Sequence, residues 1–134
     1  PGQLDVGHGV TLEPGGESLV IADRKNAELD RFDLEGNYLS TMKLAPETRP
    51  CDTDFLEGLM VVACLAGPDP RGAPIYLVRD GEIVSTLKPR MELGLLRFNS
   101  IHNAALVKRD GKIYIIAQAW NPGDFAIFEQ VLPE

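Results

Sequence analysis

The chain has 134 residues, enough for one domain with its own hydrophobic core, and its 44% hydrophobic and 25% charged residues are typical of a soluble globular protein. Its net charge of -7 argues against a nucleic-acid partner, because phosphate binding needs clustered Lys and Arg. The longest apolar run, residues 59–66, is too short to cross a bilayer, so no membrane partner is expected.

The first residues, Pro1-Gly2-Gln3-Leu4-Asp5, lack an initiator Met and also lack the basic start and apolar run of a signal peptide. We therefore expect a processed product or a fragment whose targeting information was lost with the preceding residues. Two cysteines are too few for a disulfide scaffold, which favours a reducing, cytoplasmic setting.

Short β-type runs separated by turn residues follow one another along the chain. The predicted strands occupy residues 18–22, 29–33, 38–42, 59–63, 74–78, 83–87, 112–117 and 125–129. The dipeptides Glu57-Gly58, Asp80-Gly81 and Asp110-Gly111 are typical of two-residue hairpin turns. Only residues 90–98 suggest one or two turns of helix.

The strands repeat in three units of about 40 to 50 residues, a length typical of propeller blades. His8, Cys51 and His102 hold the same position at the start of each unit. The sequence therefore predicts an all-β single partial domain, residues 1–134, made of three antiparallel four-stranded blades of a six-bladed β-propeller. The blades cover approximately residues 8–49, 50–99 and 100–134, and the last one is incomplete. A compact β-sandwich of the same strands is the alternative.

Three blades cannot close a ring, and two blade faces would expose apolar surface. Either an N-terminal half is missing, or two chains self-associate to complete one six-bladed ring. We favour a truncated parent, with self-association as its physical consequence.

Two stretches of the first unit resemble an NHL repeat: residues 8–16, which begin His8-Gly9-Val10, and residues 19–26, followed by Phe32-Asp33. Within that group the chain is most similar to the peptidyl-hydroxyglycine α-amidating lyases. Their Ala-Asp-Arg-Glu-Asn segment is matched by residues 22–26, whereas their Pro-His-Asp opening is matched by residues 101–103 only in its His. The resemblance spans nearly the whole chain, but the second unit matches in strand pattern alone.

The resemblance implies a zinc ion in the central channel, held by three His at the starts of inner strands. His8 and His102 match two of these metal ligands, and the blade of the third is not in this sequence. Arg24 matches a catalytic arginine, whose planar fork would suit a substrate carboxylate. The family cleaves hydroxyglycine-extended peptides into an amide and glyoxylate. Its catalytic Tyr and second Arg are missing here, so the isolated half is expected to be inactive.

Two departures from the family pattern stand out. Asn103 replaces an Asp that helps to hold a structural calcium in the family, and Val20 and Arg31 stand where secreted relatives have a disulfide pair. His8 and His102 also have a plainer interpretation as the usual opening residues of a repeat, and Arg24 as an ion-pairing residue. A non-catalytic propeller segment, serving as a scaffold for a peptide or protein on its channel face, is thus the second hypothesis.

Cys51 lies at the unit position of the two histidines, where it would be either a third soft ligand or, as we favour, a small buried hydrophobe. Counting outward from the Glu57-Gly58 turn places Cys51 opposite Cys64, close enough for a disulfide, although reduced thiols are expected. The acidic residues Asp23, Asp52, Asp54 and Asp69 lack the spacing of an EF-hand loop, so no metal is assigned to them.

Overall fold

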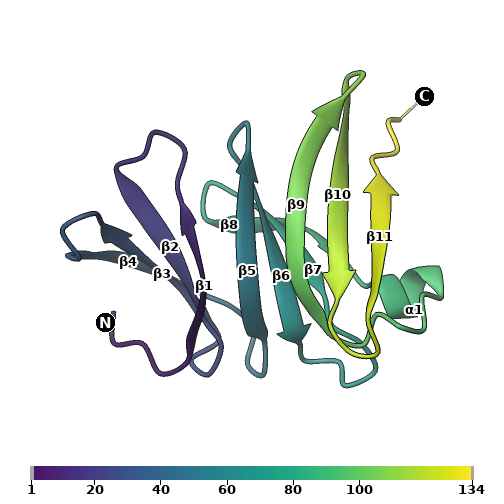
Figure 1. Ribbon diagram of the computed structural model, residues 1–134, viewed down its shortest axis with the longest axis horizontal. Helices are drawn as coiled ribbons and strands as arrows, with labels where there is room; N and C mark the ends of the chain where they lie inside the picture. The colour runs from purple at the N-terminus through teal and green to yellow at the C-terminus, as the bar shows by residue number, and fades with distance from the viewer. Residues whose placement is uncertain (1, 134) are drawn as a thin grey trace.

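The computed structural model describes residues 2–133 and contains three antiparallel β-sheets that stand side by side (Figure 1). Pro1 and Glu134 lie outside the described residues. The first sheet has the order β1 (Gly7–Leu12), β2 (Ser18–Asp23), β3 (Glu28–Asp33) and β4 (Tyr38–Lys43). The second has the order β5 (Arg49–Leu56), β6 (Leu59–Ala66), β7 (Ile75–Arg79) and β8 (Glu82–Leu87). The third consists of β9 (Ile101–Arg109), β10 (Lys112–Ala119) and β11 (Asp124–Glu129).

Each sheet is built from consecutive strands, as propeller blades are, and only the third has three strands rather than four. A β-sandwich would place the same strands in two facing sheets, so that alternative is not the fold observed. The all-β, blade-like arrangement agrees with the prediction, while the number of blades in a closed ring stays a prediction.

Three hairpins turn at the dipeptides that the sequence singled out. Both residues of Glu57-Gly58, Asp80-Gly81 and Asp110-Gly111 have positive φ, between 48° and 78°. Two positive φ angles define the type I′ turn, whose twist matches that of the flanking strands. These turns fix the pairing of β5 with β6, β7 with β8 and β9 with β10.

A short helix, α1 (Pro89–Leu93), lies in the region where helical turns were predicted. It ends at Gly94, which has a φ of 68°. Within residues 2–133, no helix has the length and apolarity needed to span a membrane.

The central strand β6 is buried on both of its faces. Val61 and Ala63 pack in a core shared with the third sheet, whereas Val62 and Cys64 pack in a core shared with the first sheet. Successive side chains of a strand point to opposite faces, so this strand alternates between the two cores. The second sheet is therefore the middle layer of the stack.

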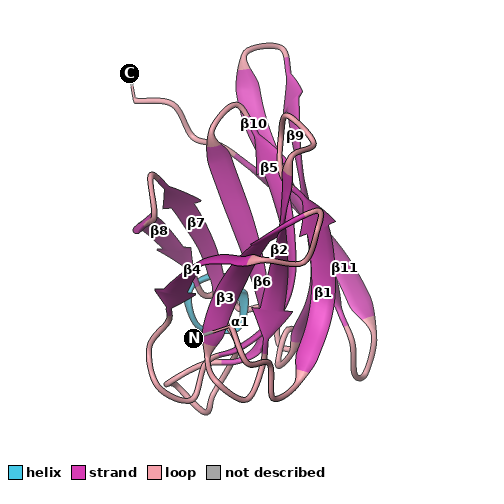
Figure 2. Cartoon of the chain, turned by 90° about the vertical axis from the view of Figure 1, so that its left-hand side faces the viewer, coloured by secondary structure: helices cyan, strands magenta, loops and turns pink. Residues whose placement is uncertain are grey.

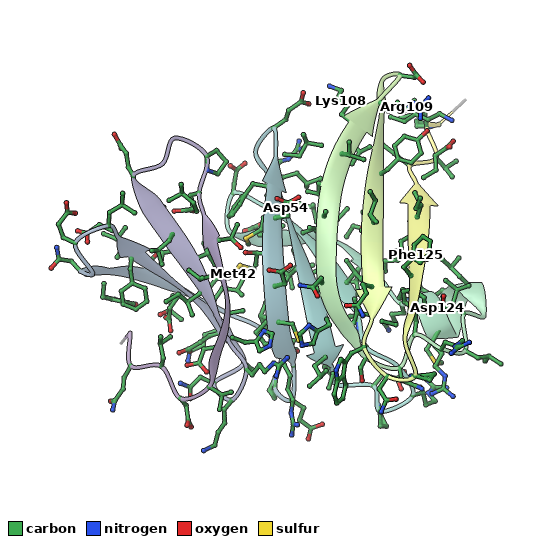
Figure 3. The ribbon with its side chains drawn as sticks, in the orientation of Figure 1. Met42, Asp54, Lys108, Arg109, Asp124 and Phe125 are labelled. Carbon is green, nitrogen blue, oxygen red and sulfur yellow. The ribbon has the colours of Figure 1, made fainter. Side chains whose placement is uncertain are left out.

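The edges of the inner strands β1, β5 and β9 are joined by side chains rather than by a continuous ladder. Thr11 Oγ1 donates to the Thr53 carbonyl at 2.8 Å, and Asp54 Oδ2 accepts the Leu106 N–H at 2.8 Å. Figure 3 labels Asp54 on β5, beside β9. These bonds satisfy backbone groups that an open strand edge would leave unpaired.

The two end faces of the stack carry uncovered apolar side chains. On β11, Ala126 and Phe128 pack inward, while Phe125 and Ile127 on the opposite face are 67% and 59% exposed (Figure 3). Figure 2 views the stack from the side of the first sheet, whose outer face is lined by Leu4, Leu19, Ile21 and Phe32. Exposed apolar faces of this kind mark surfaces that interact with other elements or partners.

One prediction about register is wrong. Cys64 pairs with Pro50 and not with Cys51, because β5 gains an extra residue at that point. Both cysteines are free thiols within the described chain. Val20 and Arg31, at the family's disulfide positions, are direct cross-strand partners.

Candidate metal site at the inner-strand bulges

Each inner strand has a β-bulge close to its first residue. The residues on either side of Cys51 pair with consecutive residues of β6, and those on either side of His102 pair with consecutive residues of β10. In β1, His8 and Gly9 together lie opposite the single residue Ala22. The extra residue of a bulge is left unpaired in the ladder, so its side chain need not follow the regular alternation of side chains between the two faces of the sheet.

The three bulges bring His8, Cys51 and His102 together. β1, β5 and β9 run in the same direction and begin at the lower edge of the stack in Figure 1. One ring nitrogen of each histidine and the Cys51 sulfur lie within 4.8 Å of one another. The two imidazole centroids are 4.7 Å apart, with the rings at 89°. Cys51 is buried, His102 is half-buried and His8 is exposed.

His8 is oriented by the backbone of the neighbouring sheet. Its Nδ1 lies 2.8 Å from the carbonyl oxygen of Cys51. A carbonyl only accepts, so Nδ1 carries the proton and Nε2 of the neutral ring keeps a free lone pair. Gly9 permits this close approach, because a Cβ at that position would lie 2.2 Å from the same oxygen.

His102 is oriented by an amide and a carboxylate. Asn103 Nδ2 donates to Asp52 Oδ2 at 3.2 Å, which identifies the other amide atom as the acceptor. That atom, Oδ1, lies 3.2 Å from His102 Nδ1, so His102 also carries its proton on Nδ1. A partner on the far nitrogen that fixes the tautomer is a regular feature of metal-binding histidines.

Arg24 extends from the end of β2 to these same ligand atoms. Its Nη2 donates to Cys51 Sγ at 3.1 Å and to His102 Nε2 at 3.2 Å. Its Nε is buried and has no hydrogen-bond partner among the described residues. The lone pairs that a metal would use thus already bind a cationic group.

The Cys51 thiol has a raised pKa because burial disfavours the thiolate, and the nearby Arg24 offsets this only in part. Burial also raises the pKa of the Cys64 thiol, which is in the core between the first two sheets. A metal-bound thiol is deprotonated outright, so its coordination would release the Cys51 proton.

A hollow of about 440 Å³ shares Arg24 with this site, although none of the three candidate ligands lines it. Arg24, Lys25 and Arg49 contribute three cationic side chains to its lining, against one carboxylate from Glu47. This balance favours an anionic ligand in the hollow, beside Arg24.

The three side chains fit a zinc ion. Two neutral imidazoles and one thiol are nitrogen and sulfur donors of the kind that Zn²⁺ prefers, and three protein ligands leave a fourth position open. The tautomers of His8 and His102 are consistent with this use, whereas the guanidinium of Arg24 occupies the lone pairs of Cys51 and His102 that the ion would need.

Comparisons with known proteins identify the fold and no family. Neither a protein-family model nor a curated protein sequence matches the chain. Among solved structures, hydrazine synthase from Kuenenia stuttgartiensis matches with a TM-score of 0.61 and 12% identity, over 91% of this chain and 38% of that one. Virginiamycin B lyase from Staphylococcus aureus matches with a TM-score of 0.57 and 11% identity, over 91% of this chain and 40% of that one. Both are β-propeller-type folds, and this chain spans about two fifths of their length.

The structure gathers all three residues that the sequence singled out for the site, His8, His102 and Arg24, and adds Cys51 between them. Cys51 is fully buried, as the favoured interpretation as a small hydrophobe requires, and its sulfur also lies within 4.8 Å of a ring nitrogen of each histidine. Its position within the repeat was the signal that pointed to the site.

Proposed function

We propose that this chain is the zinc-bearing part of a β-propeller enzyme of lyase type, with His8, Cys51 and His102 as the zinc ligands. The observation that carries the proposal is the convergence of these side chains from three separate sheets, each from a bulge at the same place in its blade. The two imidazole rings each have a further contact, at Nδ1, that orients the ring.

The substrate class that we propose is a peptide ending in hydroxyglycine, following the resemblance to the amidating lyases. Bound zinc would supply Lewis-acid polarisation of a substrate oxygen. Arg24, once released from Cys51 and His102, would offer its fork to the substrate carboxylate. Lys25 and Arg49 add positive charge to the hollow into which that carboxylate would enter.

The complete active site requires further blades, which would cover the two apolar end faces. We propose that, when the chain stands alone, a second copy covers them and completes a ring of six blades. Phe125 and Ile127 at one end and the groove along Leu19 and Ile21 at the other support this assembly.

A second candidate function is that of a non-catalytic scaffold. Arg24 satisfies Cys51 and His102 without any metal, so the same four side chains would serve as a polar link between the blades. In that case the channel face would bind a peptide or protein through its charges rather than through a metal.

Zinc analysis of protein prepared without a His tag separates the two candidates. The zinc-site proposal expects one zinc per chain, and its loss in His8→Ala, Cys51→Ser and His102→Ala. Cys64→Ser, which changes the other buried thiol, serves as the matched control and should keep the metal. A cobalt-substituted protein should have a thiolate-to-cobalt charge-transfer band that is absent in Cys51→Ser and kept in Cys64→Ser. Metal-free wild-type protein with an unaltered fold would favour the scaffold.

The substrate proposal is tested separately by peptide binding to the zinc-loaded chain. A peptide with a free C-terminal carboxylate should bind about tenfold more tightly than its C-terminal amide, and Arg24→Gln should remove the preference. Equal binding of the two peptides would refute the carboxylate role and leave the zinc site standing.

A further inference from the structure

Three acidic side chains gather on the outer face of the first sheet, away from the zinc ligands. Asp23 ends β2 and is the cross-strand partner of Glu28, while Asp30 lies two residues further along β3 on the same face. All three are buried, with exposed fractions of 0%, 5% and 0%. One carboxylate oxygen of each lies within 4.8 Å of the others.

Two of these carboxylates have partners that balance them. Asp23 accepts the backbone N–H of Asp5 at 2.8 Å and of Val6 at 3.0 Å. These bonds and those from Asn26 lower the pKa of Asp23 although burial alone would raise it, so its carboxylate is charged. Glu28 forms an ion pair with Lys43.

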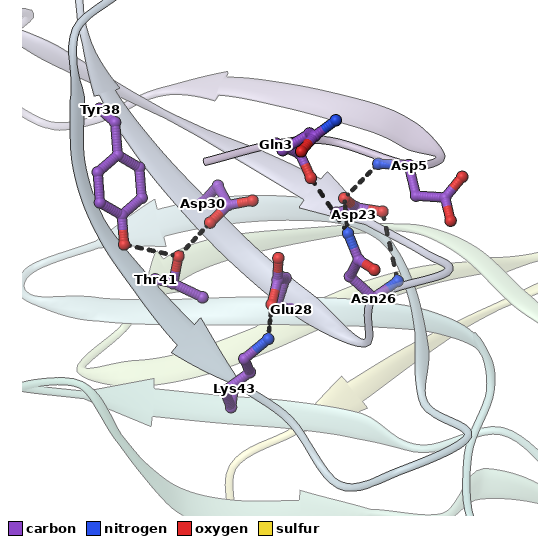
Figure 4. Close-up of polar contacts among 9 residues, drawn as sticks. All are labelled: Gln3, Asp5, Asp23, Asn26, Glu28, Asp30, Tyr38, Thr41 and Lys43. Atoms are coloured by element: carbon purple, nitrogen blue, oxygen red, sulfur yellow. Dashed lines mark hydrogen bonds and ion pairs between the residues drawn. The ribbon is translucent and has the colours of Figure 1, made fainter. Parts of the chain in front are cut away.

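Asp30 is only half satisfied. Its Oδ1 accepts a hydrogen bond from Thr41 Oγ1, but its buried Oδ2 has no partner among residues 2–133. Figure 4 shows this second oxygen turned away from Thr41, toward the side on which Asp23 and Glu28 lie. A fully buried carboxylate oxygen without a partner is costly, so a proton or a cation is needed there.

We propose that Asp23, Glu28 and Asp30 form a binding site for a hard divalent cation, Ca²⁺, that is independent of the zinc site. The donors are oxygens alone, which calcium prefers and which differ from the nitrogen and sulfur donors at the inner strands. Opposed ligands of Ca²⁺ stand up to about 5 Å apart and those of Mg²⁺ about 4 Å apart. Donor atoms within 4.8 Å of one another fit either span. Ca²⁺ is favoured because it accepts irregular sets of carboxylates, whereas Mg²⁺ demands near-ideal octahedral geometry and keeps several waters.

A hollow reaches one of the three carboxylates. A hollow of about 410 Å³ opens over Glu28 and Thr41 and is bounded on its other side by the chain at Gly2 and Gln3. Asn26 Nδ2 bonds both Asp23 Oδ2 and the Gln3 carbonyl, so the first residues of the chain lie against the cluster (Figure 4). Calcium would thus tie the turn between β2 and β3 to the segment that leads into β1.

The sequence did not reveal this site, because its three acids lack EF-hand spacing. Their proximity comes from the pairing of β2 with β3 and not from a loop. The rival occupant is a proton: burial raises the pKa of Asp30, and the hydrogen bond from Thr41 offsets this only in part.

The test is calcium titration of the metal-stripped chain, with heat of binding and thermal melting as the measurements. We expect one Ca²⁺ per chain and a rise in Tm of about 10 °C at a hundredfold excess over the Kd. Asp30→Asn, which keeps the shape of the side chain, and Glu28→Gln should each weaken Ca²⁺ binding at least tenfold. Asp80→Asn in the turn between β7 and β8 removes the same charge at a distance and should bind as the wild type does.

The outcomes separate the two occupants. If a proton fills the site, wild-type protein will bind no Ca²⁺ at millimolar concentration and Asp30→Asn will melt at or above the wild-type Tm, which overturns the proposal. Calcium binding that survives in both Asp30→Asn and Glu28→Gln would also overturn it. The zinc-ligand variants His8→Ala and Cys51→Ser should retain Ca²⁺ binding, so each of the two proposed metal sites is tested independently of the other.

Discussion

Nη2 of Arg24 lies 3.2 Å from Nε2 of His102, although 78 residues separate the two in sequence. A guanidinium carries only hydrogen-bond donors, so Arg24 donates to the lone pair of His102 Nε2, which a metal would require. The same group also donates to the Cys51 sulfur. Arg24 and a bound metal ion would therefore compete for the same two atoms.

This competition predicts that Arg24→Gln binds zinc more tightly than the wild type. Removal of the guanidinium frees both ligand atoms and removes a positive charge from the site, and we expect about a tenfold lower Kd. Competition with a chromophoric zinc chelator measures it. Lys25→Gln removes the same charge from the next residue, whose amine pairs with Asp5, and should change the Kd less than twofold. Weaker zinc binding by Arg24→Gln would show that the guanidinium supports the metal rather than opposing it.

Gly9→Ala should destabilise the fold and weaken zinc binding together. The added Cβ would lie 2.2 Å from the Cys51 carbonyl oxygen, so β1 must move away from β5 and take His8 with it. We expect a loss of about 2 kcal/mol in the free energy of unfolding, measured by urea titration. Gly7→Ala is the control, since its Cβ would come no closer than 3.4 Å to Leu4 and should change stability by less than about 0.5 kcal/mol. Equal effects of the two substitutions would contradict the tight approach of the strands.

The features of the fold and site that could be predicted from the sequence are those decided by residues close together in the chain. The hairpins followed from the Asp-Gly and Glu-Gly dipeptides, because a type I′ turn is decided by its own two residues. The bulge at Cys51 has no such local signature, and the count from the Glu57-Gly58 turn to Cys64 was therefore wrong by one residue. The contacts of Arg24 with Cys51 and His102 join three sheets, so they depend on how the sheets pack.

The same distinction applies to the acidic cluster. A search for calcium-binding loops considers residues close together in sequence, whereas Asp23, Glu28 and Asp30 meet across two strands. The repeat itself was readable, because His8, Cys51 and His102 recur at one unit position. Their convergence on one point was implied for the histidines only by the resemblance to a propeller family.

Glu13→Gln should lower stability at neutral pH and have less effect in acid. Glu13 is bonded by Ser18 and by the guanidinium of Arg31, with Nη2–Oε2 at 2.7 Å. Burial would raise the pKa of Glu13, but these bonds outweigh burial and lower it below 4.5. Because the pKa is lower in the folded state, the carboxylate contributes stability above the ordinary pKa of 4.5, and this is lost as the pH falls through the lowered value.

We expect Glu13→Gln to lose about 0.5–1 kcal/mol at pH 7, with the difference shrinking below pH 4.5, in urea titrations at a series of pH values. Glu17→Gln, at an exposed position in the same turn, should change stability by less than about 0.3 kcal/mol at every pH. A Glu13→Gln difference that stays constant down to pH 3 would mean that the loss comes from packing and not from the charge.

The exposed faces at the ends of the stack predict association that depends on concentration. Phe125 and Ile127 lie on the face of β11 that points away from the second sheet, and burying both would remove a large apolar area from water. We expect sedimentation velocity to show dimers at micromolar concentration, and the Phe125→Asp and Ile127→Asp double variant to be monomeric. Val84→Asp changes an apolar residue that is 57% exposed on the outer strand β8, and it should leave the dimer intact. All three proposed zinc ligands come from one chain, so the monomeric variant should keep its zinc site. It should lose affinity for peptide, because a peptide in the channel of a completed ring would contact the inner ends of the blades of both chains. A wild-type chain that stays monomeric at millimolar concentration would refute pairing through these faces.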